Sequence, residues 1–217
     1  MRHLMAPHWR IAAISPLLAL LLPASALAEP NCDISQFTSV ATAFQKGVVS
    51  GGKGGRAYFH NGGDGCPSEA CRRKAYVIAG DIVLVGSTST DWTCVAFVGA
   101  KGAITGWIAK DQLALTATNP NPSLAAWGGE WKSGRNSLSI QAQNGGSISV
   151  NGLALWGDGP APRTGEVQGA ATPTGARASV KDGACQVTLT LADDWLIASD
   201  NQQCGGLNVN FSDVYRR

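Results

Sequence analysis

Beyond residue 28, the sequence carries a single imidazole side chain, that of His60. A hydrolase or transferase needs a nucleophile with a base, paired carboxylates or a metal ion, so a Ser–His or Cys–His site would have to include this residue. His60 precedes Asn61-Gly62-Gly63, which is typical of the end of a strand. A lone histidine in that position is more often an exposed side chain than a catalytic base. We therefore expect no enzyme built on an imidazole.

Paired carboxylates are the second route to catalysis, and the sequence offers Asp193 with Asp194 or Glu130 with Glu166. Glycoside hydrolysis needs two carboxyl groups roughly 5–10 Å apart in one cleft. Adjacent residues of a strand face opposite sides of the sheet, and two consecutive aspartates are typical of a hairpin turn. We therefore expect a turn at Asp193-Asp194 and a protein that is not an enzyme.

Six cysteines lie beyond residue 28, an even number that is typical of a disulfide-bonded protein in an oxidising compartment. Six cysteines allow fifteen pairing schemes, and spacing alone does not choose among them. Proximity along the chain favours Cys66 with Cys71 and Cys185 with Cys204, which leaves Cys32 with Cys94.

A metal site is not indicated. A zinc site formed by the cysteines is not expected, because the sequence has no CxxC motif and only one histidine beyond residue 28. Asp158, Asp182 and Asp200 are separate carboxylates with no calcium-binding loop around them. We expect neither a metal nor any other cofactor.

The first 28 residues have the pattern of a secretory signal. Arg2 and Arg10 form a positive region, residues 11–22 are apolar, and Ala26-Leu27-Ala28 is a small-residue cleavage site. The apolar stretch is shorter than the roughly 18 residues of a membrane helix, and no later stretch approaches that length. The sequence predicts a signal peptide at residues 1–28 and a periplasmic or secreted protein without a transmembrane segment.

The charges beyond residue 28 balance, with 15 Lys and Arg against 15 Asp and Glu. Nucleic-acid binding usually needs a strongly basic face, so we expect no nucleic-acid partner. The basic run Arg72-Arg73-Lys74 is interpreted as the solvated entrance to a strand.

A break falls at residues 116–123, where two prolines and polar residues interrupt the apolar alternation. Asp33 is a candidate cap for a short helix with Phe37 and Phe44 on one face, whereas the Gly-rich residues 47–55 have the composition of a linker. The predicted organisation has four parts after the signal: an extension or linker at 29–54, a first domain at 55–117, a linker at 118–126 and a second domain at 127–217.

Short strands are expected throughout the first domain, at residues 56–60, 75–79, 82–85, 92–97 and 106–108. The run RKAYVIAGDIVLV at residues 73–85, followed by Trp92 and then by GWIAKDQL at residues 106–113, resembles a bacterial SH3-like domain of exported proteins. The resemblance covers about residues 55–115 and implies a small barrel. The Gly- and Cys-rich loop at residues 61–71 departs from the family pattern.

Domains of this SH3-like kind gather aromatic side chains along a groove that holds extended peptides or cell-wall fragments. Aromatic faces suit both ligands. We expect Tyr76 in the core. Trp107 fits a position in the core and a position in the groove equally well. The resemblance thus implies a set of ligand-binding candidates: Tyr58, Phe59, His60, Trp92 and Trp107.

The second domain also reads as short strands. Alternating runs flank Asn144-Gly145-Gly146, which predicts a hairpin, and further strands are expected at residues 185–191, 193–200 and 207–215. Residues 157–174 are rich in Gly, Pro and Ala and predict a long loop. Gly129-Glu130-Trp131 is similar to the first strand of calycin-type barrels, which include small-ligand carriers and, more loosely, periplasmic lysozyme inhibitors. We expect an antiparallel β-barrel or sandwich, so the whole fold is predicted to be all-β and disulfide-stabilised.

The leading functional hypothesis is an exported, non-enzymatic binding protein of the cell envelope. Its SH3-like domain would contact peptidoglycan or a peptide or protein partner. The alternative is a periplasmic inhibitor of lysozyme or of a toxin, acting through a protruding loop such as residues 157–174. A cell-wall hydrolase or its accessory comes third. Neither the ligand nor the oligomeric state follows from the sequence.

Overall fold

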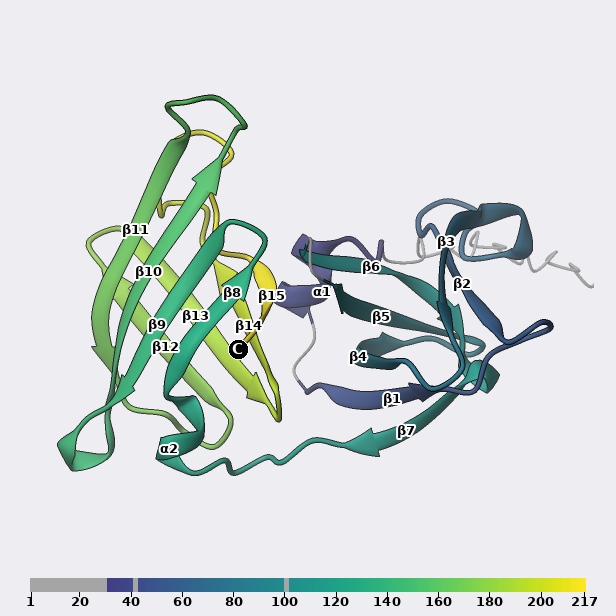
Figure 1. Ribbon diagram of the computed structural model, residues 1–217, viewed down its shortest axis with the longest axis horizontal. Helices are drawn as coiled ribbons and strands as arrows, with labels where there is room; N and C mark the ends of the chain where they lie inside the picture. The colour runs from purple at the N-terminus through teal and green to yellow at the C-terminus, as the bar shows by residue number, and fades with distance from the viewer. Residues whose placement is uncertain (1–30, 41–42, 100–101) are drawn as a thin grey trace, which may run out of the picture.

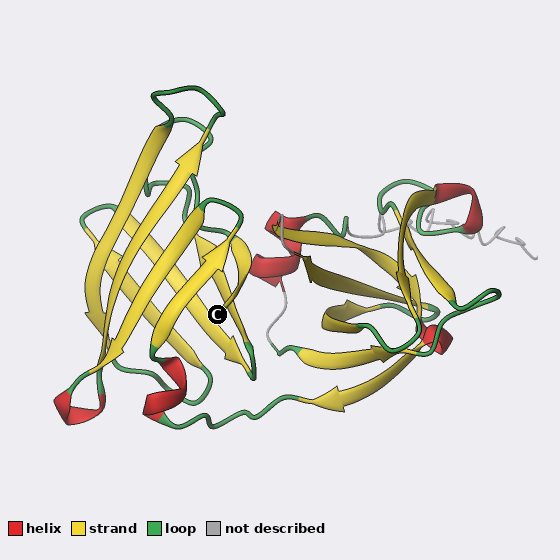
Figure 2. Cartoon of the chain, in the orientation of Figure 1, coloured by secondary structure: helices red, strands yellow, loops and turns green. Residues whose placement is uncertain are grey.

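The computed structural model describes residues 31–40, 43–99 and 102–217. The predicted signal peptide at residues 1–28 lies outside the described residues. The described part is dominated by two antiparallel sheets, one with seven strands and one with eight, which lie side by side (Figures 1 and 2). This confirms the expected all-β fold. No helix among the described residues is long and apolar enough to cross a membrane.

The seven-stranded N-terminal sheet has the spatial order β3-β2-β6-β5-β4-β1-β7. The predicted strand at residues 56–60 is found with the same ends, and the other predicted strands are found in longer form. The bounds are β1 Gln45–Val49, β2 Arg56–His60, β3 Arg72–Ile78, β4 Ile82–Thr88, β5 Trp92–Gly99, β6 Gly102–Ala109 and β7 Leu113–Ala117, with 3-10 turns η1 Glu69–Cys71 and η2 Lys110–Gln112.

The expectation of a linker from residue 47 is wrong, because β1 occupies residues 45–49 and pairs with both β4 and β7. Gly47 explains why this strand was missed. A Cβ atom at Gly47 would lie 3.0 Å from Val85 and 3.1 Å from Val83, so glycine leaves room for the valine side chains of the neighbouring strand β4.

A short helix α1, Ile34–Val40, precedes β1 as expected. The Asp33 side chain accepts a hydrogen bond from the backbone N–H of Gln36 at 2.9 Å, which is the predicted cap. The rings of Phe37 and Phe44 meet with their centroids 5.5 Å apart. Figure 1 shows that α1 lies between the two sheets.

The eight-stranded C-terminal sheet has the order β11-β10-β9-β8-β15-β14-β13-β12. Its end strands approach each other, and the backbone N–H of Gln168 donates to Asp182 at 2.9 Å across the seam, so the sheet is a nearly closed barrel. The bounds are α2 Leu124–Trp127, β8 Gly129–Ser133, β9 Asn136–Ala142, η3 Asn144–Gly146, β10 Ile148–Trp156, β11 Arg163–Ala171, β12 Arg177–Asp182, β13 Cys185–Ala192, β14 Trp195–Asp200 and β15 Asp213–Arg216.

Two turns of the barrel are found where the sequence predicts them, whereas one loop and one strand differ from the prediction. Asn144-Gly145-Gly146 joins β9 to β10, and Asp193-Asp194 joins β13 to β14, both as predicted. The long loop expected at residues 157–174 is wrong, because residues 163–171 form β11 and only residues 157–162 and 172–174 lie outside the strands. The strand expected at residues 207–215 begins only at Asp213.

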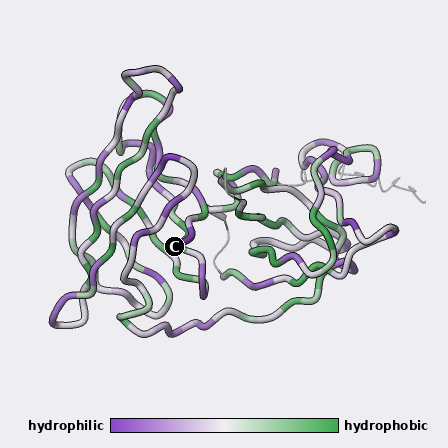
Figure 3. Tube along the Cα trace, in the orientation of Figure 1, coloured by the Kyte–Doolittle hydropathy of each residue, from purple (hydrophilic) through white to green (hydrophobic). Residues whose placement is uncertain are grey.

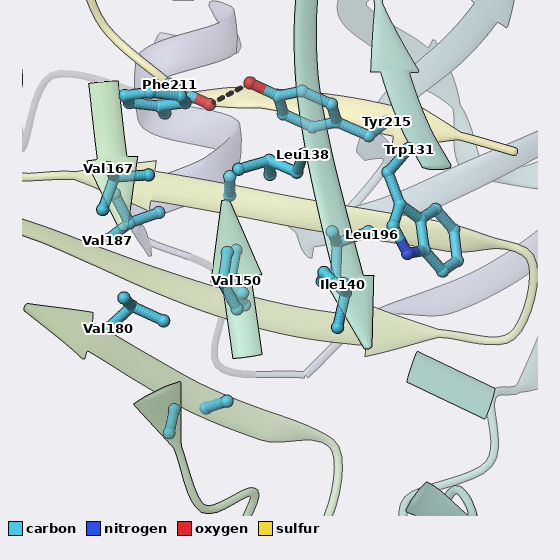
Figure 4. Packing of buried hydrophobic residues seen from close by; sticks show 14 of the residues in the cluster. Trp131, Leu138, Ile140, Val150, Val167, Val180, Val187, Leu196, Phe211 and Tyr215 are labelled. Carbon is cyan, nitrogen blue, oxygen red and sulfur yellow. Dashed lines mark hydrogen bonds between the residues drawn. The ribbon is translucent and has the colours of Figure 1, made fainter. Parts of the chain in front are cut away.

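The interior of the barrel is filled with side chains. Hydrophobic and polar residues alternate along its strands (Figure 3), as a sheet with one buried face requires. Figure 4 shows the packing, in which the Tyr215 hydroxyl donates to the backbone oxygen of Phe211 at 2.8 Å. Trp131, Tyr215 and Phe211 are fully buried, and their rings occupy space that small side chains would leave empty.

Two further clusters hold the N-terminal sheet. Its interior is small and aliphatic and consists of Val49, Ala57, Phe59, Val77, Val83, Val85, Val95 and Ile108. The second cluster lies between the two sheets, where residues of α1, β4, β5 and β6 meet Ala192, Trp195, Ile197 and Val214 of the barrel. The two sheets are therefore joined by a buried apolar contact.

Three disulfides are formed: Cys32–Cys94, Cys66–Cys71 and Cys185–Cys204. They are the pairs that proximity favoured. Such bonds form and persist in oxidising compartments, which indicates a protein located outside the cytoplasm.

Candidate functional site

The outer face of the N-terminal sheet points away from its aliphatic interior. Pairing across four strands forms one row on this face, consisting of Cys94 on β5, Trp107 on β6, His60 on β2 and Arg72 on β3. Alternate residues of a strand share a face, so Trp92 lies on the same side, next to this row. The fold thus brings three of the predicted candidates, His60, Trp92 and Trp107, onto one face.

Part of this outer face is covered. Helix α1 and the barrel strands β14 and β15 pack over β4, β5 and β6, and they bury Cys94 and Trp107. The Cys32–Cys94 disulfide fastens the chain before α1 to the middle of the face. Over β2 and β3 the face is open, because Arg72 is exposed and Tyr76 keeps 43% of its surface. Any ligand must therefore approach this face over β2, β3 and the start of β5.

His60 lies where the covered and open parts meet, and it is 4% exposed. The expectation of an exposed side chain is therefore wrong. Its ring meets that of Trp92 edge-on, with the centroids 4.5 Å apart. Its Nδ1 lies 3.4 Å from the backbone oxygen of Trp107, so Nδ1 carries the hydrogen in the neutral tautomer that makes this bond. Nε2 is then an acceptor, and it has no hydrogen-bond partner in the described part of the chain.

A cleft of about 610 Å³ opens beside Trp92, and we call it the Trp92 cleft. The backbone N–H of Lys110 donates to the carbonyl of Asp91 at 2.8 Å, which holds η2 against the start of β5. Three carboxylates and one ammonium group line the cleft, so it favours cations. The lining residues are Glu69, Thr90, Asp91, Trp92, Ala109, Lys110 and Asp111.

Glu69 lines the Trp92 cleft, and His60, which is not part of the lining, lies next to it. Two acceptor atoms, His60 Nε2 and Glu69 Oε1, lie 3.9 Å apart. Because Nε2 is enclosed and the Glu69 side chain is exposed, the Glu69 carboxylate is the acceptor that a ligand nitrogen reaches directly. Trp92 lines the same cleft, and its ring is the strongest aromatic partner for a cation. The exposed Glu69 carboxylate and the Trp92 ring are groups that can interact with an amine or a guanidinium group.

A second feature of the open face is a stack of four side chains, Arg72, Tyr58, Tyr76 and Arg56, which we call the tyrosine ladder. The rings of Tyr58 and Tyr76 lie with centroids 5.6 Å apart. The Arg72 guanidinium lies 4.8 Å from the centroid of Tyr58, and that of Arg56 lies 4.4 Å from the centroid of Tyr76. The pKa of the exposed Arg56 guanidinium is raised, mainly by hydrogen bonding with the Tyr58 hydroxyl and then by the electrostatic effect of Tyr76. Its charge is therefore permanent.

The remaining two candidates are buried. Phe59 is 1% exposed and belongs to the aliphatic interior of the sheet, and Trp107 is 1% exposed in the cluster between the sheets. Tyr76, which the sequence places in the core, instead stands on the open face of the edge strand β3. The site is therefore built from Tyr58, His60 and Trp92 together with residues that sequence reasoning did not select.

The missed residues are the carboxylates of the cleft. Glu69 lies in η1, at the end of a loop closed by Cys66–Cys71, and this closure brings it to His60. Asp91 precedes Trp92 at the start of β5, and Asp111 follows Lys110 in η2. The signal that could have found them is acidic residues clustered around the tryptophan in the predicted SH3-like run.

The barrel offers no comparable cleft in its interior, because its large side chains occupy that space. A Cβ at Gly152 would lie under 3.0 Å from Leu138, Val167 and Phe211, so the packing closes even over glycine. Its distinct surface feature is at one end. There Trp156 is 44% exposed and Leu207 is 72% exposed, and the Arg163 guanidinium lies 5.0 Å from the Trp156 ring centroid.

Metal binding has no support among the described residues, because no three His, Cys, Asp or Glu side chains come close enough to hold an ion. Comparison with protein-family models, with curated proteins and with solved structures finds no match.

Proposed function

We propose that the protein is a periplasmic or secreted binding protein of the cell envelope, and that the Trp92 cleft holds an extended peptide of the cell wall or of an envelope protein through a cationic group. The observation that carries this proposal is the buried His60, whose unpartnered Nε2 faces Glu69 beside the ring of Trp92. A buried acceptor without a partner carries a desolvation cost of about 1–3 kcal/mol. In this proposal, binding at Glu69 opens the site enough for a ligand donor to reach Nε2 and remove that cost.

The resemblance of residues 55–115 to bacterial SH3-like domains supports the same site. Trp92 begins a strand, η2 follows the Gly-Trp-Ile strand, and the loop at residues 61–71 carries Glu69 on the other side. A cleft between two loops and a turn, with a tryptophan at its base, suits a peptide in an extended conformation. The signal-like residues 1–28 and the three disulfides support the compartment.

Binding to purified sacculi tests the proposal. The protein beginning after residue 28, with its disulfides formed, is expected to be retained on sacculi or on an immobilised envelope protein. Trp92→Ala should lose at least about tenfold in affinity, the loss typical of a central aromatic contact. Trp156→Ala is the matched control, because it removes a half-exposed tryptophan from the barrel. Equal binding of the Trp92→Ala variant, or no binding to either material, would contradict the proposal.

A second candidate function is supported by the end of the barrel. The hairpin of β10 and β11 projects beyond the other strands (Figure 1), and the exposed Trp156 and Leu207 lie there. A protruding apolar hairpin fits the active-site cleft of an enzyme, which is how an inhibitor of lysozyme or of a toxin would act. A lysozyme assay with stoichiometric protein separates the two functions, since an inhibitor loses its effect in Trp156→Ala and keeps it in Trp92→Ala.

A further inference from the structure

The two arginines of the tyrosine ladder have no carboxylate partners among the described residues. Across the part of the chain that the structure describes, the only lysine or arginine side chain within 4.0 Å of a carboxylate is Arg135, which lies 3.9 Å from Asp158. Arg56, Arg72 and the neighbouring Lys74 are all exposed and have no carboxylate within 4.0 Å in that part of the chain. Arg73, by contrast, donates to the backbone oxygen of Thr105 at 2.6 Å and serves the fold. The ladder cations are therefore available to a ligand.

The ladder also holds its guanidinium groups in place. Each guanidinium lies over a tyrosine ring, at 4.8 Å from the ring centroid for Arg72 and 4.4 Å for Arg56. A guanidinium stacked in this way keeps its N–H edge free for a bidentate bond to a carboxylate. Because the side chains are ordered before binding, less conformational entropy is lost when the anion binds.

The tyrosine ladder begins beside His60, which lies next to the Trp92 cleft. Tyr58 is two residues before His60 on β2, so the two side chains stand on one face about 7 Å apart. Arg72 pairs with His60 across the strands. An extended peptide with one group in the cleft would place its following alternate side chains over Arg72 and then over Tyr76 and Arg56.

Main-chain pairing with the edge strand β3 is disfavoured. Both the N–H and the C=O of Ile78 are already engaged with Asp81, through bonds of 2.9 and 3.0 Å. The register with β2 shifts between Tyr58 and His60, which disrupts the strand edge. Recognition on this face must therefore come from side chains.

We infer that the tyrosine ladder is a carboxylate subsite that binds the acidic side chains or the terminal carboxylate of the same extended peptide. The inference rests on the proposed function of the Trp92 cleft. An anionic glycan fits less well, because the ring faces that sugars would stack on are covered by guanidinium groups. An anionic membrane or nucleic acid fits less well, because the charges beyond residue 28 balance and only a local patch is basic.

Two fluorescein-labelled peptides of eight residues test the inference by anisotropy with the full disulfide-bonded chain that begins after residue 28. One carries a lysine near one end and glutamates at the alternate positions that follow, and the other has glutamine at each glutamate position. The glutamate peptide is expected to bind about tenfold more tightly. In Arg56→Gln/Arg72→Gln its affinity should fall to that of the glutamine peptide, whereas the glutamine peptide should bind as before. Arg135→Gln/Arg177→Gln on the barrel is the matched control.

The outcomes separate the two proposals. Equal binding of both peptides to the wild-type chain, together with loss of both in Trp92→Ala, would overturn the ladder and keep the cleft. Failure of both peptides to bind would overturn both proposals. Tighter retention on phosphatidylglycerol vesicles or on a polyanionic glycan, abolished by Arg56→Gln/Arg72→Gln, would overturn the inference in favour of a polyanion surface. Unchanged circular dichroism of the variant excludes unfolding as the cause.

Discussion

The two sheets of this protein bury their residues in opposite ways. The barrel encloses one large aromatic and aliphatic core, and its interior leaves no room for a ligand. The N-terminal sheet has a smaller aliphatic interior and places aromatic and charged residues on its outer face, where α1 and the barrel cover one part and leave the other open. The barrel therefore contributes the larger buried core, whereas the groups that we propose for recognition lie on the open face.

The largest expected effect is on the barrel core. Trp131 is fully buried, and its indole N–H donates to the backbone oxygen of Trp127 at 3.0 Å. Trp131→Ala should cost about 3–5 kcal/mol of unfolding free energy, because it leaves a cavity and an unpaired carbonyl. Denaturant unfolding measures this loss. Trp92→Ala should cost far less, and similar losses for the two variants would break the comparison.

The disulfides should differ in a predictable order. Cys32–Cys94 closes a sequence separation of 62 residues and joins the region before α1 to the outer face, whereas Cys66–Cys71 closes only 5. The chain-entropy relation gives about 4 kcal/mol for the first and about 2 kcal/mol for the second. Alanine pairs at each position, compared by denaturant unfolding, measure both. A larger loss of unfolding free energy without Cys66–Cys71 than without Cys32–Cys94 would contradict this order. It would show that Cys32–Cys94 does not stabilise the contact between α1 and the outer face.

A smaller effect, dependent on pH, is expected at the barrel edge. Burial raises the pKa of Asp213 above 3.8, although the N–H of Val214 donates to its carboxylate at 2.7 Å. Folding then favours the protonated form, so the stability that Asp213 contributes is present below pH 3.8 and is lost as the pH rises through the raised pKa. Asp213→Asn should therefore be more stable than the wild type at pH 7, by less than about 1 kcal/mol. Unfolding at pH 3 and pH 7 measures the difference, which should vanish in acid.

Much of the fold was predictable because local rules and tertiary packing agree. The strand at residues 56–60, the helix capped by Asp33 and the two hairpin turns follow from patterns within a few residues. The disulfide pairs follow from proximity along the chain for Cys66–Cys71 and Cys185–Cys204, and from elimination for Cys32–Cys94. The two missed strands, β1 and β11, share one cause, which is glycine inside a strand. Gly47 in β1 and Gly165 in β11 read as breakers, but a Cβ at Gly165 would lie 2.2 Å from the backbone oxygen of Cys204. These glycines serve close approach between segments far apart in sequence.

The candidate site was predictable only in part. Periodicity places Tyr58, His60 and Trp92 on strands, but it does not say which face another part of the chain will cover. Trp107 is buried because the barrel and α1 pack over it, and Tyr76 is exposed because β3 is an edge strand. The position of Glu69 beside His60 depends on how the loop at residues 61–71 closes, which no local pattern encodes.

The indole signals of the folded protein test the central claim most directly. A ¹H–¹⁵N spectrum of the chain that begins after residue 28, recorded during titration with soluble peptides released from sacculi, reports on Trp92 in the cleft and on Trp156 on the barrel hairpin separately. The account predicts that the Trp92 indole signal shifts in a saturable way and that the Trp156 signal does not move. A shift of Trp156 with Trp92 unchanged would contradict the account and assign recognition to the barrel.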